Sequence, residues 1–116
     1  MTRSLDGFYS ALFTGKAGEG AAMFILSDGV LVGADPLGVL FDGSYIPDAN
    51  GGFTGMVTVK APPNGELVQG VTTGPDGLTY EVGVEIPSDF ETRPFITLTT
   101  PLGPVNFTLK RLRGMA

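Results

Sequence analysis

The chain of 116 residues contains no cysteine, no histidine and no tryptophan. Without cysteine it has no disulfide, no thiolate nucleophile and no cysteine-ligated metal site. Without histidine it lacks the usual general base and the commonest metal ligand near neutral pH. No serine lies in an activating motif. We therefore expect a protein that is not an enzyme, with no catalytic residue, no metal site and no cofactor.

Long apolar runs are also missing. The chain is 42% hydrophobic and 16% charged, yet no window approaches the roughly 18 consecutive apolar residues that a membrane helix needs. Its first residues, MTRSLDG, lack the apolar segment of a secretory signal. These features predict a cytoplasmic protein that does not bind membranes. The length predicts a single domain over residues 1–116.

Positive charge is scarce, and the formal net charge is −5. Residues 1–109 hold four of the seven basic residues and all twelve acidic ones. A body with this balance repels a phosphate backbone, so we expect no direct binding of nucleic acid.

Turn-forming residues are abundant, with 18 glycines and nine prolines. They separate short apolar or alternating runs, most densely in Met23–Tyr45, where Asp28-Gly29 favours a two-residue hairpin turn. The pattern predicts no helix. It predicts strands over residues 8–14, 19–27, 30–35, 39–46, 53–60, 78–86, 93–100 and 105–111.

Eight strands joined by mostly short turns favour an all-β fold, an eight-stranded antiparallel up-and-down barrel. An even number of strands lets the first and the last pair and close the sheet. A β-sandwich is the alternative. Residues 61–77 fit a long loop better than an extra edge strand, and a loop of this length commonly covers a cavity.

Strict alternation over residues 78–86 predicts one apolar face, directed inward. An eight-stranded barrel is either filled by side chains or just wide enough for one small ligand. The residues expected to line such a cavity are Val57, Tyr80, Val82, Val84, Phe107 and Leu109.

The second to fourth strands are apolar at consecutive positions, unlike the fifth, sixth and eighth. An outer apolar face predicts a homodimer. We expect its interface to use one of the alternating sets around Phe24, Leu26, Val30, Val32, Leu40 and Phe41. Alternatively, the long loop or the N-terminal residues cover this face within one chain.

The acidic residues suggest no catalytic pair and one possible protein-binding patch. Glu81 and Glu85 share a strand face but lie ~14 Å apart, too far for a glycosidase pair. Glu85, Asp89 and Glu91 could present a negative patch to a basic partner, or simply belong to a solvated loop.

Several short motifs, taken in their order along the chain, resemble those of a known protein family. Asp6-Gly7-Phe8-Tyr9, Ser27-Asp28-Gly29, Gly33-Ala34-Asp35 and Gly43-Ser44-Tyr45 precede a closing strand that reads VNFTLKRL. This pattern resembles the GrlR-like family, bacterial negative regulators of type III secretion gene expression. Many members have two glycines before the aspartate where this chain has Gly33-Ala34. The resemblance implies a homodimeric, lipocalin-like barrel with an apolar cavity plugged by a loop at one end.

Two functions follow as hypotheses. The resemblance implies transcription regulation through binding of a transcriptional activator, expected to be basic, without contact with DNA. The alternative is a carrier or sensor of a small hydrophobic ligand in the barrel, for which an adventitious lipid-like molecule is the expected occupant.

Overall fold

The computed structural model describes residues 4–115, which form one sheet of eight strands and no helix. No helix able to cross a membrane is found in this range. The strands are β1 (Gly7–Gly15), β2 (Gly18–Ser27), β3 (Val30–Ala34), β4 (Leu40–Pro47), β5 (Phe53–Ala61), β6 (Leu78–Ile86), β7 (Ile96–Thr100) and β8 (Gly103–Arg113).

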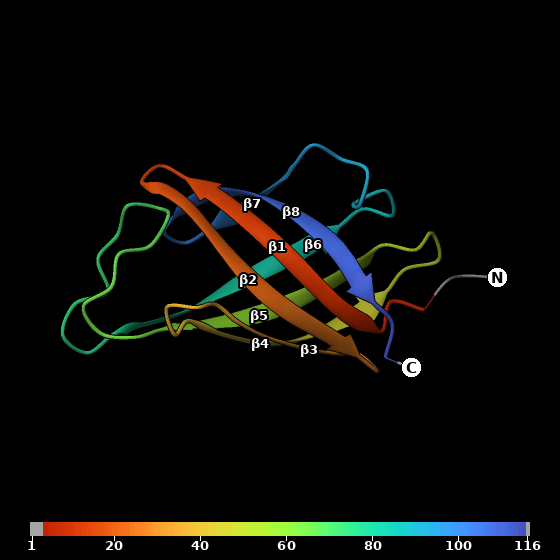
Figure 1. The fold of residues 1–116 in the computed structure, drawn as a ribbon, viewed down its shortest axis with the longest axis horizontal. Helices are drawn as coiled ribbons and strands as arrows, with labels where there is room; N and C mark the ends of the chain where they lie inside the picture. Colours follow the sequence, from red (N-terminus) through yellow and green to blue (C-terminus); the bar gives the residue numbers. More distant parts are fainter. Residues whose placement is uncertain (1–3, 116) are drawn as a thin grey trace.

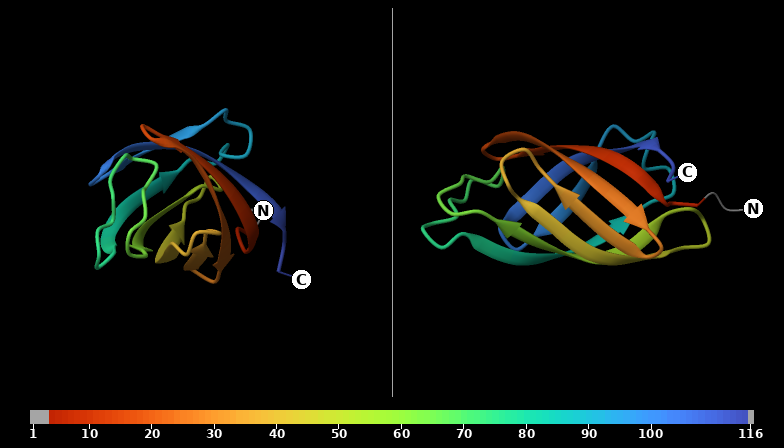
Figure 2. Two further views of the ribbon diagram at one scale, coloured as in Figure 1. Left: turned by 60° about the vertical axis from the view of Figure 1, so that its left-hand side comes forward. Right: turned by 60° about the horizontal axis from the view of Figure 1, so that its bottom comes forward.

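The strands follow one another around a barrel-shaped sheet in the order β6-β5-β4-β3-β2-β1-β8-β7, and every pair is antiparallel. The expected pairing of the first strand with the last is present. Figures 1 and 2 show the sheet curling until β6 and β7 approach each other. The fold is therefore the predicted all-β up-and-down barrel, nearly closed, rather than a sandwich.

A seam between β6 and β7 interrupts this closure. The two strands contact each other, but no ladder joins them within residues 4–115. The predicted strand over 93–100 begins only at Ile96. Pro94 has no N–H to donate to a ladder, and residues 87–92 instead form turns, with Phe90 N–H donating to the Pro87 carbonyl at 3.2 Å.

The Asp28-Gly29 turn has the conformation that the sequence predicts. Both residues have positive φ, 50° and 83°, as the two central positions of a tight hairpin require. This turn fixes the register of β2 on β3, with Leu26 opposite Leu31.

Three inward-facing glycines lie where the barrel wall has no room for a side chain. Gly33, Gly43 and Gly55 lie on β3, β4 and β5. A β-carbon on Gly43 would overlap the carbonyl oxygen of Met56, and one on Gly55 would overlap that of Ser44. Glycine in a strand often marks such a close backbone approach at a barrel bend.

One end of the barrel is closed by its own core. Leu5 and Phe90 are buried there with Tyr9, whose hydroxyl donates to the Leu5 carbonyl at 2.7 Å. The Phe90 ring packs on Tyr9 and Phe53, with centroids 6.2 and 6.3 Å away.

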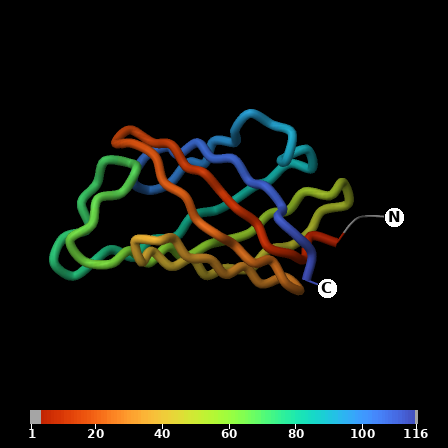
Figure 3. Tube along the Cα trace, viewed as in Figure 1, coloured from red at the N-terminus to blue at the C-terminus, as the bar shows by residue number. Residues whose placement is uncertain are grey.

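The other end carries the long loop, residues 62–77, which lies at the mouth of the barrel in Figure 3. It is the loop expected from the sequence, although Ala61 belongs to β5. Its pairing is limited to one isolated bridge between Glu66 and Thr72. The loop is attached to the β1–β2 turn, where Ala17 N–H donates to the Val68 carbonyl at 2.8 Å.

Candidate ligand-binding site

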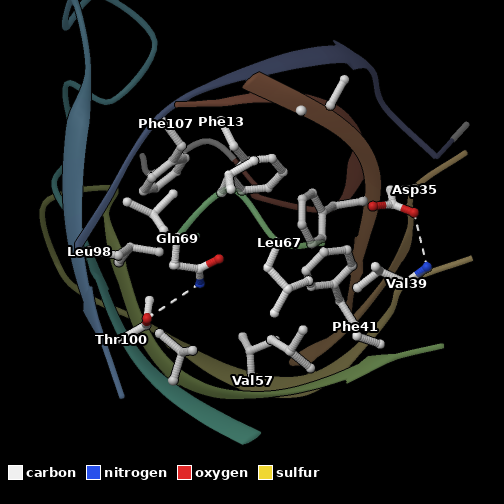
Figure 4. Close-up of a pocket in the computed structure, with 18 of the residues that line it drawn as sticks. Phe13, Asp35, Val39, Phe41, Val57, Leu67, Gln69, Leu98, Thr100 and Phe107 are labelled. Atoms are coloured by element: carbon white, nitrogen blue, oxygen red, sulfur yellow. Dashed lines mark hydrogen bonds between the residues drawn. The ribbon is translucent and has the colours of Figure 1, made fainter. Parts of the chain in front are cut away.

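The barrel contains a partly open cavity of about 240 Å³. Figure 4 shows aliphatic and aromatic side chains directed into it from around the wall, with Leu67 reaching in from the long loop. Its apolar lining includes Phe13, Phe24, Leu26, Leu31, Val39, Phe41, Phe53, Val59, Leu67, Ile86, Leu98 and Val105.

The six residues expected at a cavity also lie in this lining: Val57, Tyr80, Val82, Val84, Phe107 and Leu109. The β5–β6 register places Val57 opposite Val82 and Gly55 opposite Val84, all on the inner face. That these residues contact a ligand stays a prediction.

A cluster of phenylalanines fills part of the inner face. The Phe24 and Phe41 rings have centroids 5.0 Å apart, and Phe13 lies 6.4 Å and 6.2 Å from them. The register aligns Phe24 and Phe41 with Gly33 between them. An added β-carbon on Gly33 would overlap the Phe24 ring, so this glycine makes room for the aromatic cluster.

Three of the six residues expected at the dimer interface lie inside the barrel. Phe24 and Phe41 line the cavity, as does Leu26, which is only 1% exposed. None of the three can contribute to an outer surface. The error arose because consecutive apolar residues do not indicate which alternating set faces inward; the ladders decide it.

The other expected interface residues lie on the outer face. Val30, Val32 and Leu40 are 52%, 39% and 47% exposed. Met23, which sequence reasoning missed, lies on the same face because it pairs with Ala34, which pairs with Leu40. Met23, Val30, Val32 and Leu40 are called the outer apolar face below.

Polar groups enter the cavity at the loop end. Gln69 is 9% exposed, and its Nε2 donates to the Tyr80 hydroxyl at 3.1 Å and to Thr100 Oγ1 at 3.4 Å. Burial raises the pKa of the Tyr80 hydroxyl, which keeps it neutral. Sequence reasoning missed Gln69; the only signal was a polar residue among the loop's apolar ones.

The three acidic residues expected to form a patch differ in their surroundings. Glu85 is exposed on the outer face of β6, whereas Glu91 is half-buried in the turn before β7. Asp89 Oδ1 accepts a hydrogen bond from Arg93 Nε at 2.8 Å, and this bond lowers the pKa of the Asp89 carboxyl. Asp89 is thus already paired within the chain.

Among residues 4–115, no three Asp or Glu side chains are placed to hold a metal ion. Glu81 and Glu85 both lie on the exposed side of β6, away from the cavity. What the site can do is enclose an apolar molecule and contact it with a few polar groups at one end.

Comparison with family models, curated proteins and solved structures finds no match. The resemblance to the GrlR-like family therefore stays a prediction, and the function must be argued from the cavity.

Proposed function

We propose that this protein is a non-enzymatic carrier or sensor of a small hydrophobic molecule, bound inside the barrel. The observation that supports this proposal is the unfilled apolar cavity of about 240 Å³. Close packing is the rule in protein interiors, where voids larger than a water molecule are few. A cavity of this size, lined by aromatic and aliphatic side chains, is the arrangement typical of ligand sites.

The cavity volume limits the ligand. A cavity of roughly 150 Å³ binds benzene, and sites for drug-sized molecules begin at roughly 300 Å³. The ligand expected here is larger than benzene and smaller than most drugs, or a slender alkyl chain. Lining residues from both β5 and β6 would contact it.

Val57→Phe is expected to weaken binding of the neutral fluorescent probe phenylnaphthylamine at least about tenfold, because the larger ring occupies the cavity. The measurement is a fluorescence titration, together with native mass spectrometry of the purified protein for a co-purified molecule. The control is Met56→Phe, which adds a ring one residue away on the outer face of β5. Wild-type protein that binds neither this probe nor a simple alkyl ligand would exclude the proposed function.

We also propose a homodimer through the outer apolar face. Two copies related by a twofold axis would each cover the apolar side chains of the other, as isologous interfaces do. Among the outward residues of β3 and β4 the one charged side chain is Asp42, opposite Val32. The occupant is thus expected to be apolar, and a second copy meets that requirement.

Met23→Lys is expected to shift the protein from dimer to monomer, because it buries a charge at the interface opposite the uncharged residues Ser10 and Ala34. Sedimentation velocity measures the mass of the species. Thr99→Lys, on the exposed face of β7, is the control and leaves the dimer intact. A wild-type monomer at micromolar concentration would disprove the dimer.

The regulatory role stays a hypothesis from the resemblance. No contact of the described residues favours binding of a transcriptional activator, and Asp89, one of its three expected partner-binding residues, is paired with Arg93. We therefore place the carrier or sensor function first.

A further inference from the structure

The polarity of the cavity is confined to one end. The polar side chains in its lining, apart from Tyr9, come from the long loop and the strand ends beside it: Glu19, Asp35, Glu66, Gln69, Thr73, Tyr80 and Thr100. At the opposite end the Tyr9 hydroxyl is bound to the Leu5 carbonyl, and the lining is otherwise apolar, with Phe53 and Ile86. This distribution suits a ligand with one polar end and one apolar end.

Most hydrogen-bond donors of the polar end are already used within the chain. The hydroxyls of Thr73 and Thr100 each donate to a carbonyl oxygen at 2.6 Å, those of Pro62 and Gly103. Gln69 Nε2 donates to Tyr80 and Thr100. The Tyr80 hydroxyl proton is the one side-chain donor of this group with no acceptor among residues 4–115.

An acceptor is left open instead. Gln69 Oε1 has no hydrogen-bond partner among the described residues, although the side chain is more than nine-tenths buried. In Figure 4 the Gln69 amide reaches into the cavity from the loop, its nitrogen turned to Thr100 and its oxygen away from it. Among residues 4–115 the one buried side-chain nitrogen or oxygen without a partner is Arg111 Nε, so Gln69 Oε1 is accessible, and a donor on the ligand can bind to it.

The charged residues in the lining are all acidic. Glu19 and Glu66 are exposed at the loop end, and Asp35 lies at the β3–β4 turn. Asp35 has a structural role as well, because its Oδ1 accepts the N–H groups of Leu37 and Val39, both at 2.9 Å. No lysine or arginine of the described chain lines the cavity, so nothing there compensates a negative ligand.

We propose that the ligand is a hydrophobic amine. This inference rests on the proposed function. An aliphatic amine is protonated at neutral pH, as lysine is. Its ammonium group would lie at the loop end, where it donates to Gln69 Oε1 and is attracted by Glu19 and Glu66. Its alkyl part would extend along the aromatic cluster toward the closed end of the barrel.

The test compares three ligands with the same alkyl chain: decylamine, decanol and decanoate. Calorimetric titration of the wild-type protein at neutral pH is expected to give the tightest binding for decylamine, about tenfold tighter than for decanoate. Added salt is expected to weaken decylamine binding and to leave decanol binding unchanged, because only the charged ligand is screened.

The two proposals fail differently. If decanol or decanoate binds as tightly as decylamine, the amine proposal is wrong and the hydrophobic carrier function stands. If neither these ligands nor phenylnaphthylamine binds, the carrier function itself is wrong.

Variants locate the ammonium group. Glu19→Gln combined with Glu66→Gln is expected to weaken decylamine binding several-fold and to leave decanol binding unchanged. Glu81→Gln, on the exposed face of β6, is the matched control. Gln69→Met keeps a linear side chain without the acceptor and is expected to weaken decylamine binding, with a thermal melt to verify folding. Unchanged decylamine affinity in both the double variant and Gln69→Met would overturn the proposal.

Discussion

Gly43→Ala is expected to lower the free energy of unfolding by about 3 kcal/mol, the upper part of the range for overpacking. The added methyl group would overlap the carbonyl oxygen of Met56 and press on the backbone of Val57. These are main-chain atoms of β5, held in the ladder where Ser44 pairs with Met56. They cannot move aside as a flexible side chain does, so the ladder itself must distort. Urea denaturation followed by circular dichroism measures the loss.

Gly83→Ala is the matched control. Gly83 lies on the exposed face of β6, and an added β-carbon there would meet no atom within 4 Å. Alanine lowers the conformational entropy of the unfolded chain, so the variant is expected to be as stable as the wild type or about 0.4–1 kcal/mol more stable. Equal losses at the two positions would show that the barrel does not depend on close approach at Gly43.

Leu26→Ala is expected to cost about 3 kcal/mol, within the range of buried leucine truncations. Leu26 is 1% exposed and lies between the closed end of the barrel and the cavity. The wall beside it is held by the β2–β3 ladder, where Leu26 pairs with Leu31. Collapse into the vacated space is therefore restricted, and the existing cavity becomes larger.

The control for Leu26→Ala is a leucine-to-alanine substitution on the outer face of the barrel. Leu12 is 62% exposed on β1, so Leu12→Ala removes a side chain that is mostly in water already and is expected to cost less than about 0.5 kcal/mol. Chemical denaturation of both variants measures the difference. If Leu26→Ala were as mild as Leu12→Ala, the assignment of Leu26 to the interior would be wrong.

The inner face of a strand could be predicted from the sequence for some strands of the barrel and not for others. Over residues 78–86 apolar and polar residues alternate strictly, so the bounds of β6 and its inner face were both predictable. In β2 and β4 the apolar residues are consecutive, and local pattern could not place Phe24 and Phe41. Their direction depends on pairing with Gly33, a contact between strands that periodicity does not contain.

The sequence could not predict the polar end of the cavity either, because that end depends on contacts between residues distant in the chain. Gln69 meets Tyr80 and Thr100 only because the loop folds back over the barrel. The residues are 11 and 31 positions away in the chain. Composition predicts that residues 61–77 form a loop, and the length of the loop favours a role in covering a cavity. Neither indicates which of its side chains turns inward.

The barrel wall is held least firmly between β6 and β7, because no ladder of the described residues joins these two strands. Everywhere else around the barrel, widening would break rungs of an antiparallel ladder; along this line the strands touch without such rungs. If the barrel binds a ligand as proposed, we expect the wall to widen first along this line, because no ladder hydrogen bond within residues 4–115 has to break there.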